Sequence, residues 1–199
     1  MKILEYSAGA VSKGFWFQEF KKYIEFLQEG KTVKEIKERQ EKENVLLAPS
    51  PSYGRRMLSE VSKRTNALPK EILKLFFYLT ISDQKLINLL GIMMTDRLFF
   101  EYMYEVYREK IITGNLEFDN SDTRIFLKNK SEQSEKVSNF TLQTKKRLAG
   151  TYRTYLKEAN LLIEDKGLSR IKKPILDINL EKEMKNKELY PFLRVFLGE

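Results

Sequence analysis

The amino-acid sequence predicts a mainly α-helical protein that carries one short β-hairpin in its C-terminal half. Apolar residues recur at steps of three and four through most of the chain, as they do on one face of a helix. A stretch from 139 to 174 differs, because a helix there is followed by a tight exit and a basic hairpin. With 199 residues, 42% of them hydrophobic and 32% charged, the chain is long and apolar enough to fold as one large domain or two small ones.

The helix of this stretch is defined by its spacing and by its two ends. Thr141 is a suitable N-cap, because its hydroxyl can accept a hydrogen bond from a free backbone N–H of the first turn. Asn160 stands where the helix should end, and asparagine tolerates the left-handed conformation found at many helix ends. The apolar positions between them share one helical face: Leu148, Tyr152, Tyr155, Ala159 and Leu162.

The hairpin follows directly. Residues 161–164 predict a strand, 165–167 a turn and 168–173 a return strand, which Pro174 ends. A polar helix face followed by a basic hairpin is typical of a winged helix-turn-helix, in which the helix enters the major groove and the wing follows a phosphate backbone. A solvated amphipathic helix beside a surface hairpin explains the same pattern, and the pattern alone does not separate the two.

Positive charge is concentrated in the same stretch. The whole chain has a formal net charge of +8 and a pI of about 9.4, which favours polyanionic partners, nucleic acid first and an anionic membrane surface second. Three acids lie between 141 and 173: Glu158, Glu164 and Asp165. Nine bases stand against them, namely Lys145, Lys146, Arg147, Arg153, Lys157, Lys166, Arg170, Lys172 and Lys173.

Composition argues against an enzyme. The chain contains no cysteine and no histidine, so it lacks a thiol nucleophile, a disulfide, the commonest general base and the commonest transition-metal ligand. It also lacks a P-loop and a dinucleotide-binding fingerprint. Glu101, Glu105 and Glu109 recur every four residues, but Arg108 and Lys110 lie among them, so a solvated helix face explains the row better than a metal site. We therefore expect no catalytic residue, no metal and no cofactor.

The sequence also bears on location. Residues 1–14 lack the basic and then apolar design of a signal peptide, and no run of about eighteen apolar residues is present. These features predict a cytoplasmic protein without a membrane segment. The oligomeric state is not fixed by the sequence.

The first 115 residues read as a helical half. The pattern predicts helices over 15–28, over 33–44 after a Thr32–Glu35 capping box, over 53–65 after Ser52, and over 70–80. After a cap at Ser82 it predicts helices over 86–91 and 95–113, which could be continuous through Met93. The 53–65 helix carries Arg55, Arg56, Lys63 and Arg64 against Glu60 alone, a second basic patch that could contact phosphate, although a solvated charged face is the more frequent explanation.

A break at 113–115 divides the chain into a predicted helical domain, 1–115, and a basic winged-helix-like domain, 116–199, which could share one core. In the second half, 116–120 predicts a short strand, 122–130 a helix that Asp119 or Ser121 could cap, and 181–190 a charged helix. Apolar residues beyond 190 should dock the C-terminus.

Several short motifs along the chain resemble the BrxA family, small accessory proteins of BREX bacteriophage-exclusion systems. In the N-terminal half these are Tyr6-Ser7-Ala8-Gly9, Ser12-Lys13-Gly14 with Glu19, Glu43-Asn44-Val45-Leu46, Ser52-Tyr53-Gly54-Arg55-Arg56, Asp83-Gln84-Lys85 and the aromatic helix ending at Tyr107. In the C-terminal half they are Asn139-Phe140, Thr144, Arg147-Leu148 and Ala159-Asn160-Leu161-Leu162. The likeness covers nearly the whole chain, although no single motif is diagnostic.

The resemblance implies a helical fold partly like the antitermination factor NusB, binding to double-stranded DNA, and no known catalytic activity. It also implies work beside the methyltransferase, phosphatase-like and ATPase components of a BREX system in a bacterial cytoplasm. Asn160 departs from the glycine that many relatives have at the helix exit, but asparagine meets the same backbone need. The likeness does not decide which bases contact DNA.

The leading hypothesis is therefore a DNA-binding accessory protein. Its expected contacts are Lys145, Lys146, Arg147 and Arg153 in or beside the major groove, Lys157 on the same helix, and Thr144 near base edges. Arg170, Lys172 and Lys173 would contact phosphates from the wing, and Arg55 and Arg56 would form a second backbone contact. Two alternatives stay open: a scaffold that docks another protein of the system through its aromatic N-terminal half, and an RNA-binding protein, suggested by fold analogy alone.

Overall fold

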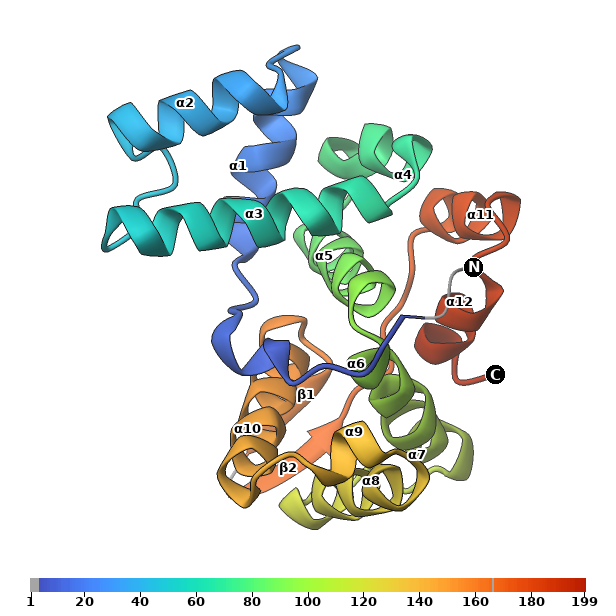
Figure 1. Ribbon diagram of the computed structural model, residues 1–199. Coiled ribbons are helices and arrows are strands. Elements are labelled where there is room, and N and C mark those ends of the chain that lie inside the picture. The colour runs from blue at the N-terminus through green and yellow to red at the C-terminus, as the bar shows by residue number, and fades with distance from the viewer. Residues whose placement is uncertain (1–3, 166) are drawn as a thin grey trace.

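The computed structural model describes residues 4–165 and 167–199, and the fold is mainly α with one two-stranded antiparallel hairpin, which confirms the predicted class. In Figure 1 the first helices lie at the top, α8 to α10 and the hairpin lie at the bottom, and the last two helices lie at one side. Among the described residues, no helix combines the length and the apolar character that a membrane crossing requires.

Capping residues set the helices of the N-terminal half. The predicted capping box of Thr32 and Glu35 is confirmed at the start of α2. Ser50, and not Ser52, caps α3, because Pro51 suits the first helical position and moves the start forward. The elements are η1 (Gly9–Ser12), α1 (Phe17–Gln28), α2 (Val33–Glu43), α3 (Pro51–Ala67), α4 (Lys70–Leu75) and η2 (Phe76–Tyr78).

A central column of helices runs through the molecule. Residues 86–93 are all buried, so this helix is surrounded by the core, and it runs unbroken through Met93 to Thr95, as the alternative of a continuous helix allows. Thr80, and not the predicted Ser82, caps it, and Asp96 caps the next helix. The elements are α5 (Ile81–Thr95), α6 (Arg97–Tyr102), the π-helical turn η3 (Met103–Tyr107) and α7 (Arg108–Thr113).

The C-terminal half follows the predicted order. The Thr141 hydroxyl accepts from the backbone N–H of Thr144, and Asn160 has φ +60°, so both predicted ends of the long helix are confirmed. The predicted charged helix over 181–190 is present as α11, but it begins three residues earlier and ends at Asn186, and a separate helix begins at Tyr190. The elements are α8 (Asn120–Gln133), α9 (Glu135–Ser138), α10 (Leu142–Glu158), β1 (Leu162–Asp165), β2 (Leu168–Ile171), α11 (Ile178–Asn186) and α12 (Tyr190–Leu197).

The hairpin gains a third short segment. Glu117 forms a single antiparallel bridge with Arg170 on β2, where a short strand is predicted. The backbone N–H of Phe118 donates to the Ser169 carbonyl at 2.8 Å, and that of Ile171 donates to the Leu116 carbonyl at 2.8 Å. The segment that enters α8 is therefore fixed to the outer edge of the hairpin.

An aromatic layer joins α10 to the central column. Phe99 on α6 lies 5.1 Å from Tyr152 and 5.2 Å from Tyr155, measured between ring centroids. The Tyr155 hydroxyl also donates to the Lys13 carbonyl at 2.8 Å, which fixes the N-terminal arm beside α10. Buried apolar side chains from both halves of the chain belong to one core cluster. The domain boundary after residue 115 stays a prediction.

The cap of α10 gives a first test. Replacing Thr141 by alanine removes the acceptor of the Thr144 N–H and should lower the free energy of unfolding by about 1 kcal/mol, measured by urea denaturation. Serine at the same position keeps the acceptor, so it should lower the free energy of unfolding by only about 0.3 kcal/mol. Equal losses for the two variants would show that packing of the threonine methyl, and not the cap, stabilises this end.

Candidate nucleic-acid interface

A groove about 640 Å³ in volume lies between α8 and α10. Its lining residues recur at helical spacing on both elements, so one face of each helix is turned toward the other. They are Asn120, Arg124, Leu127, Lys128 and Ser131 from α8, and Leu142, Lys145, Lys146, Ala149 and Gly150 from α10.

The groove is positively charged. Its lining holds four cationic side chains and no carboxylate: Arg124, Lys128, Lys145 and Lys146. Within the part of the chain that the structure describes, none of the four forms an ion pair. Sequence reasoning singled out Lys145 and Lys146 but missed Arg124 and Lys128, whose i, i+4 spacing in the predicted 122–130 helix was the available signal.

Two other predicted contacts on α10 are engaged with the hairpin. The Glu164 carboxylate on β1 accepts from Lys157 Nζ at 2.6 Å and from Arg153 Nη2 at 2.7 Å. The hydrogen bond from Lys157, and to a smaller extent that from Arg153, lowers the pKa of Glu164 below its usual value. Glu164 therefore neutralises part of the charge that α10 would otherwise present.

Arg153 is the most connected of these side chains. Besides Glu164, its guanidinium donates to Asn120 Oδ1 at 3.3 Å and to the Ser169 hydroxyl, and it lies 5.4 Å from the centroid of the Phe118 ring. These contacts join α8, α10 and both strands. The geometry makes Arg153 a residue that positions the hairpin against α10.

The first turns of α10 carry the remaining predicted residues. Arg147 is exposed, and its Nη2 donates to the Val11 carbonyl of the N-terminal arm at 3.2 Å. The Thr144 hydroxyl lies 3.0 Å from that of Thr141, within the cap of the helix. Both side chains therefore have protein partners while they line the same end of α10.

The hairpin presents its cations to solvent. Arg170, Lys172 and Lys173 are exposed and, among the described residues, make no ion pair. The base of the hairpin is held in place, because the Tyr107 hydroxyl donates to the Lys172 carbonyl at 2.8 Å and the Lys172 N–H donates to the Leu161 carbonyl at 2.9 Å. These three cations are thus carried on a fixed edge.

The second predicted basic patch lies apart from this surface. Arg55 and Arg56 are on α3, at the opposite end of the molecule from α8 in Figure 1. Arg55 pairs with Glu41 at 3.2 Å, and Arg56 lies 4.8 Å from the centroid of the Tyr53 ring. Arg64, counted in the same patch, is buried instead and donates to the Gly14 and Phe15 carbonyls, so it offers no charge to a partner.

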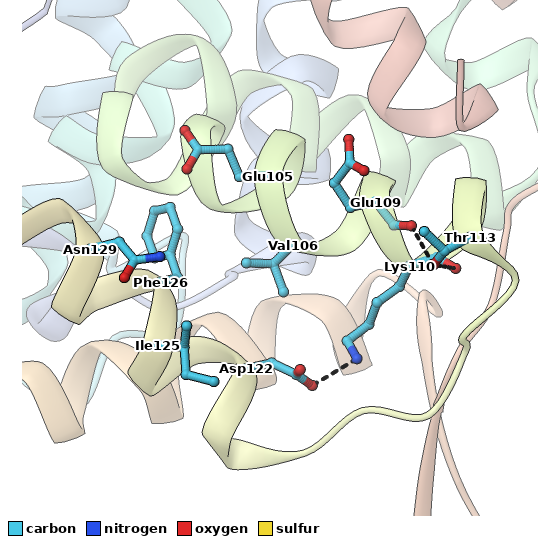
Figure 2. A pocket seen from close by; sticks show the side chains of 9 residues that line it. All are labelled: Glu105, Val106, Glu109, Lys110, Thr113, Asp122, Ile125, Phe126 and Asn129. Carbon is cyan, nitrogen blue, oxygen red and sulfur yellow. Dashed lines mark hydrogen bonds and ion pairs between the residues drawn. The ribbon is translucent and has the colours of Figure 1, made fainter.

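The other side of α8 lines a second hollow, whose acidic side chains are paired with lysine or arginine. This hollow has a volume of about 280 Å³, and it is lined by α8 on one side and by η3 and α7 on the other. Figure 2 shows Glu105 on η3, Glu109 on α7, and Lys110 reaching across to Asp122, at 2.9 Å. In the described residues, no three acidic side chains are placed so that they could hold a metal ion.

The prediction that Glu101, Glu105 and Glu109 form a solvated helix face is wrong for Glu101. The side chain of Glu101 is only 17% exposed and pairs with Lys130, which itself is 5% exposed and also reaches Glu105.

Comparison with known proteins identifies the family. The BrxA family model matches residues 4–188. The chain belongs to the BrxA family. A BrxA protein described as "BREX protein BrxA", from Bacillus cereus (strain H3081.97), is 32% identical over 194 residues, which cover 98% of this chain and 97% of that protein.

The fold of this BrxA family member is also found in a solved structure. It is similar to the crystal structure of an uncharacterized protein from Magnetospirillum magneticum, with a TM-score of 0.81, 15% sequence identity, and coverage of 98% of this chain and 100% of that one. At this identity the likeness concerns the fold alone.

Proposed function

We propose that this BrxA family member is a non-enzymatic, double-stranded-DNA-binding component of a BREX phage-defence system. The observation that carries the proposal is the α8–α10 groove, whose four cations have no acidic partner among the described residues. The hairpin that follows α10 carries three more exposed cations. Cations without protein partners remain available to neutralise phosphates. Other proteins of the BREX system are the proposed protein partners, because the Bacillus cereus relative carries that name.

The arrangement supports a winged-helix mode of binding. Two helices, α8 and α10, are joined through the short α9 and followed by a hairpin, and the bridge at Glu117 adds a third segment to its edge. In this mode α10 would enter the major groove and the hairpin would follow a backbone. Arg153 and Lys157 would position the hairpin through Glu164 and would contact DNA less than the sequence alone suggests.

The test is duplex binding by fluorescence anisotropy across a salt series. Seven cations of the proposed surface have no ion-pair partner in the part of the chain that the structure describes: Arg124, Lys128, Lys145, Lys146, Arg170, Lys172 and Lys173. If each neutralises one phosphate, log K should fall with log [salt] with a slope of about −6, which means a loss of roughly four thousandfold in affinity between 50 and 200 mM salt.

Two competitors separate this proposal from its alternatives. Structured RNA should displace duplex DNA less well than unlabelled duplex does, and heparin at equal charge should displace it only at low salt. A slope near zero, or no binding at 50 mM salt, would contradict DNA binding and favour a role in docking another protein.

A further inference from the structure

The groove between α8 and α10 is not only basic. Leu127 and Ala149 give it an apolar floor, Gly150 leaves open space above α10, and Leu142 stands at its edge with 71% of its surface exposed. A phosphate needs only hydrogen-bond donors and positive charge, so it would leave this apolar surface uncovered. The lining therefore suits a ligand that combines negative charge with an apolar body.

The size and the spread of the charges narrow the choice. A volume of about 640 Å³ lies in the range of pockets that hold small organic molecules, and it can accept a nucleotide with its base. An acyl chain carries one anionic head, whereas cations stand on both helices: Arg124 and Lys128 on one side, Lys145 and Lys146 on the other. A ligand with several negative charges along its length matches this distribution of cations better than a ligand with a single anionic head.

We propose that the groove holds unpaired nucleotides of a DNA strand, with their bases on the apolar floor and their phosphates on the four cations. The inference rests on the proposed function, because it names the form of DNA that the same surface prefers. Bases within a duplex hide their faces in the stack, and extracting one costs a few kcal/mol. A duplex that ends in a single-stranded segment offers such bases at no cost, so it is the preferred ligand.

The experiment compares probes that carry equal numbers of phosphates. The full chain is titrated with a blunt duplex, with a duplex bearing a single-stranded overhang of about six nucleotides, and with a single strand, while free deoxythymidine monophosphate serves as competitor. The overhang should bind about tenfold more tightly than the blunt duplex. A 2-aminopurine base in the overhang should change its fluorescence on binding, because it leaves its stacked neighbours.

A matched pair of variants tests the groove itself. A Cβ added at Gly150 would meet no atom within 4 Å, and the position is exposed on α10, so Gly150→Leu fills the groove without removing a cation. Both this variant and Gly150→Ala should raise helix propensity and fold. We expect Gly150→Leu to abolish the tenfold preference and Gly150→Ala to retain it.

The possible results are distinct. Equal affinity of the wild-type chain for overhang and blunt duplex would overturn the inference and leave the groove to another ligand, such as an acidic helix of a protein, while the proposed duplex binding would stand. A uniform loss on both probes in Gly150→Leu would also overturn it. Displacement of the overhang by the free monophosphate would assign the groove to free nucleotides instead. If no probe binds, the proposed function itself fails.

Discussion

Reversing two neighbouring cations of the groove, Lys145→Glu together with Lys146→Glu, is expected to weaken duplex binding at least a hundredfold at 0.1 M salt. Both lysines line the groove, and neither has an ion-pair partner among the described residues. At this salt concentration, the release of counterions contributes about 0.9 log unit per neutralised phosphate. Loss of two contacts therefore accounts for roughly sixtyfold, and repulsion by two new carboxylates adds to it.

The control for this prediction must change net charge equally at a distant place. Lys34 and Lys37 are exposed on α2, which Figure 1 places at the far end of the molecule from α8. Their reversal should weaken binding only a fewfold, and the salt slope should stay near the wild-type value. The groove pair should lower that slope by about two. Equal losses in the two double variants would mean that binding depends on overall charge and not on this surface.

Replacing Lys130 by methionine should produce the largest loss of stability, about 3 kcal/mol at pH 7. The ammonium is 5% exposed and lies 2.6 Å from Glu101 Oε2 and 2.5 Å from Glu105 Oε1. Removing one member of such a cluster leaves the other charges desolvated without compensation. Urea denaturation measures the effect, and Lys128→Met, on the same helix but exposed, should change the free energy of unfolding by less than about 0.5 kcal/mol.

The same variant should respond to pH in a defined direction. Burial alone would raise the pKa of Glu101, but hydrogen bonds from Lys130, Arg97 and Tyr6 outweigh it and hold that pKa below its ordinary value. In the wild-type chain this stabilises the fold above the pKa of the unfolded state and is lost as pH falls through the folded pKa. Without Lys130 the folded pKa should rise, so the gap between variant and wild type should narrow toward pH 4. A gap independent of pH would contradict an electrostatic cause.

The residues that cap helices could be predicted from the sequence, because a cap depends only on neighbouring residues in the chain. Thr141, Thr32 and Asn160 act within one turn of chain, and the structure has them at the predicted helix ends. Ser52 failed because Ser50 followed by Pro51 offers an equally good cap two residues earlier.

The site was harder to predict, because its charges are partnered across the fold. Arg153 and Lys157 carry the same formal charge as Lys145, yet Glu164 from the hairpin pairs with only the first two. In the sequence Arg64 looks like a surface cation on a charged helix. In the structure it is buried, and it donates hydrogen bonds to carbonyls of the N-terminal arm that are forty-nine and fifty residues earlier in the chain. The partnership of α8 with α10 likewise depends on tertiary packing, so the contribution of Arg124 and Lys128 has no short-range signature beyond their spacing.

The aromatic layer under α10 has a consequence for recognition. The Phe99 ring packs against the rings of Tyr152 and Tyr155, and the Tyr155 hydroxyl is hydrogen-bonded to the N-terminal arm. A shift of α10 would therefore disturb the core. If α10 binds DNA as proposed, its fixed position prevents it from adapting to the duplex, and any misfit would be absorbed by deformation of the DNA. Sequences with easily kinked TA or CA steps would then be favoured even where no side chain touches a base.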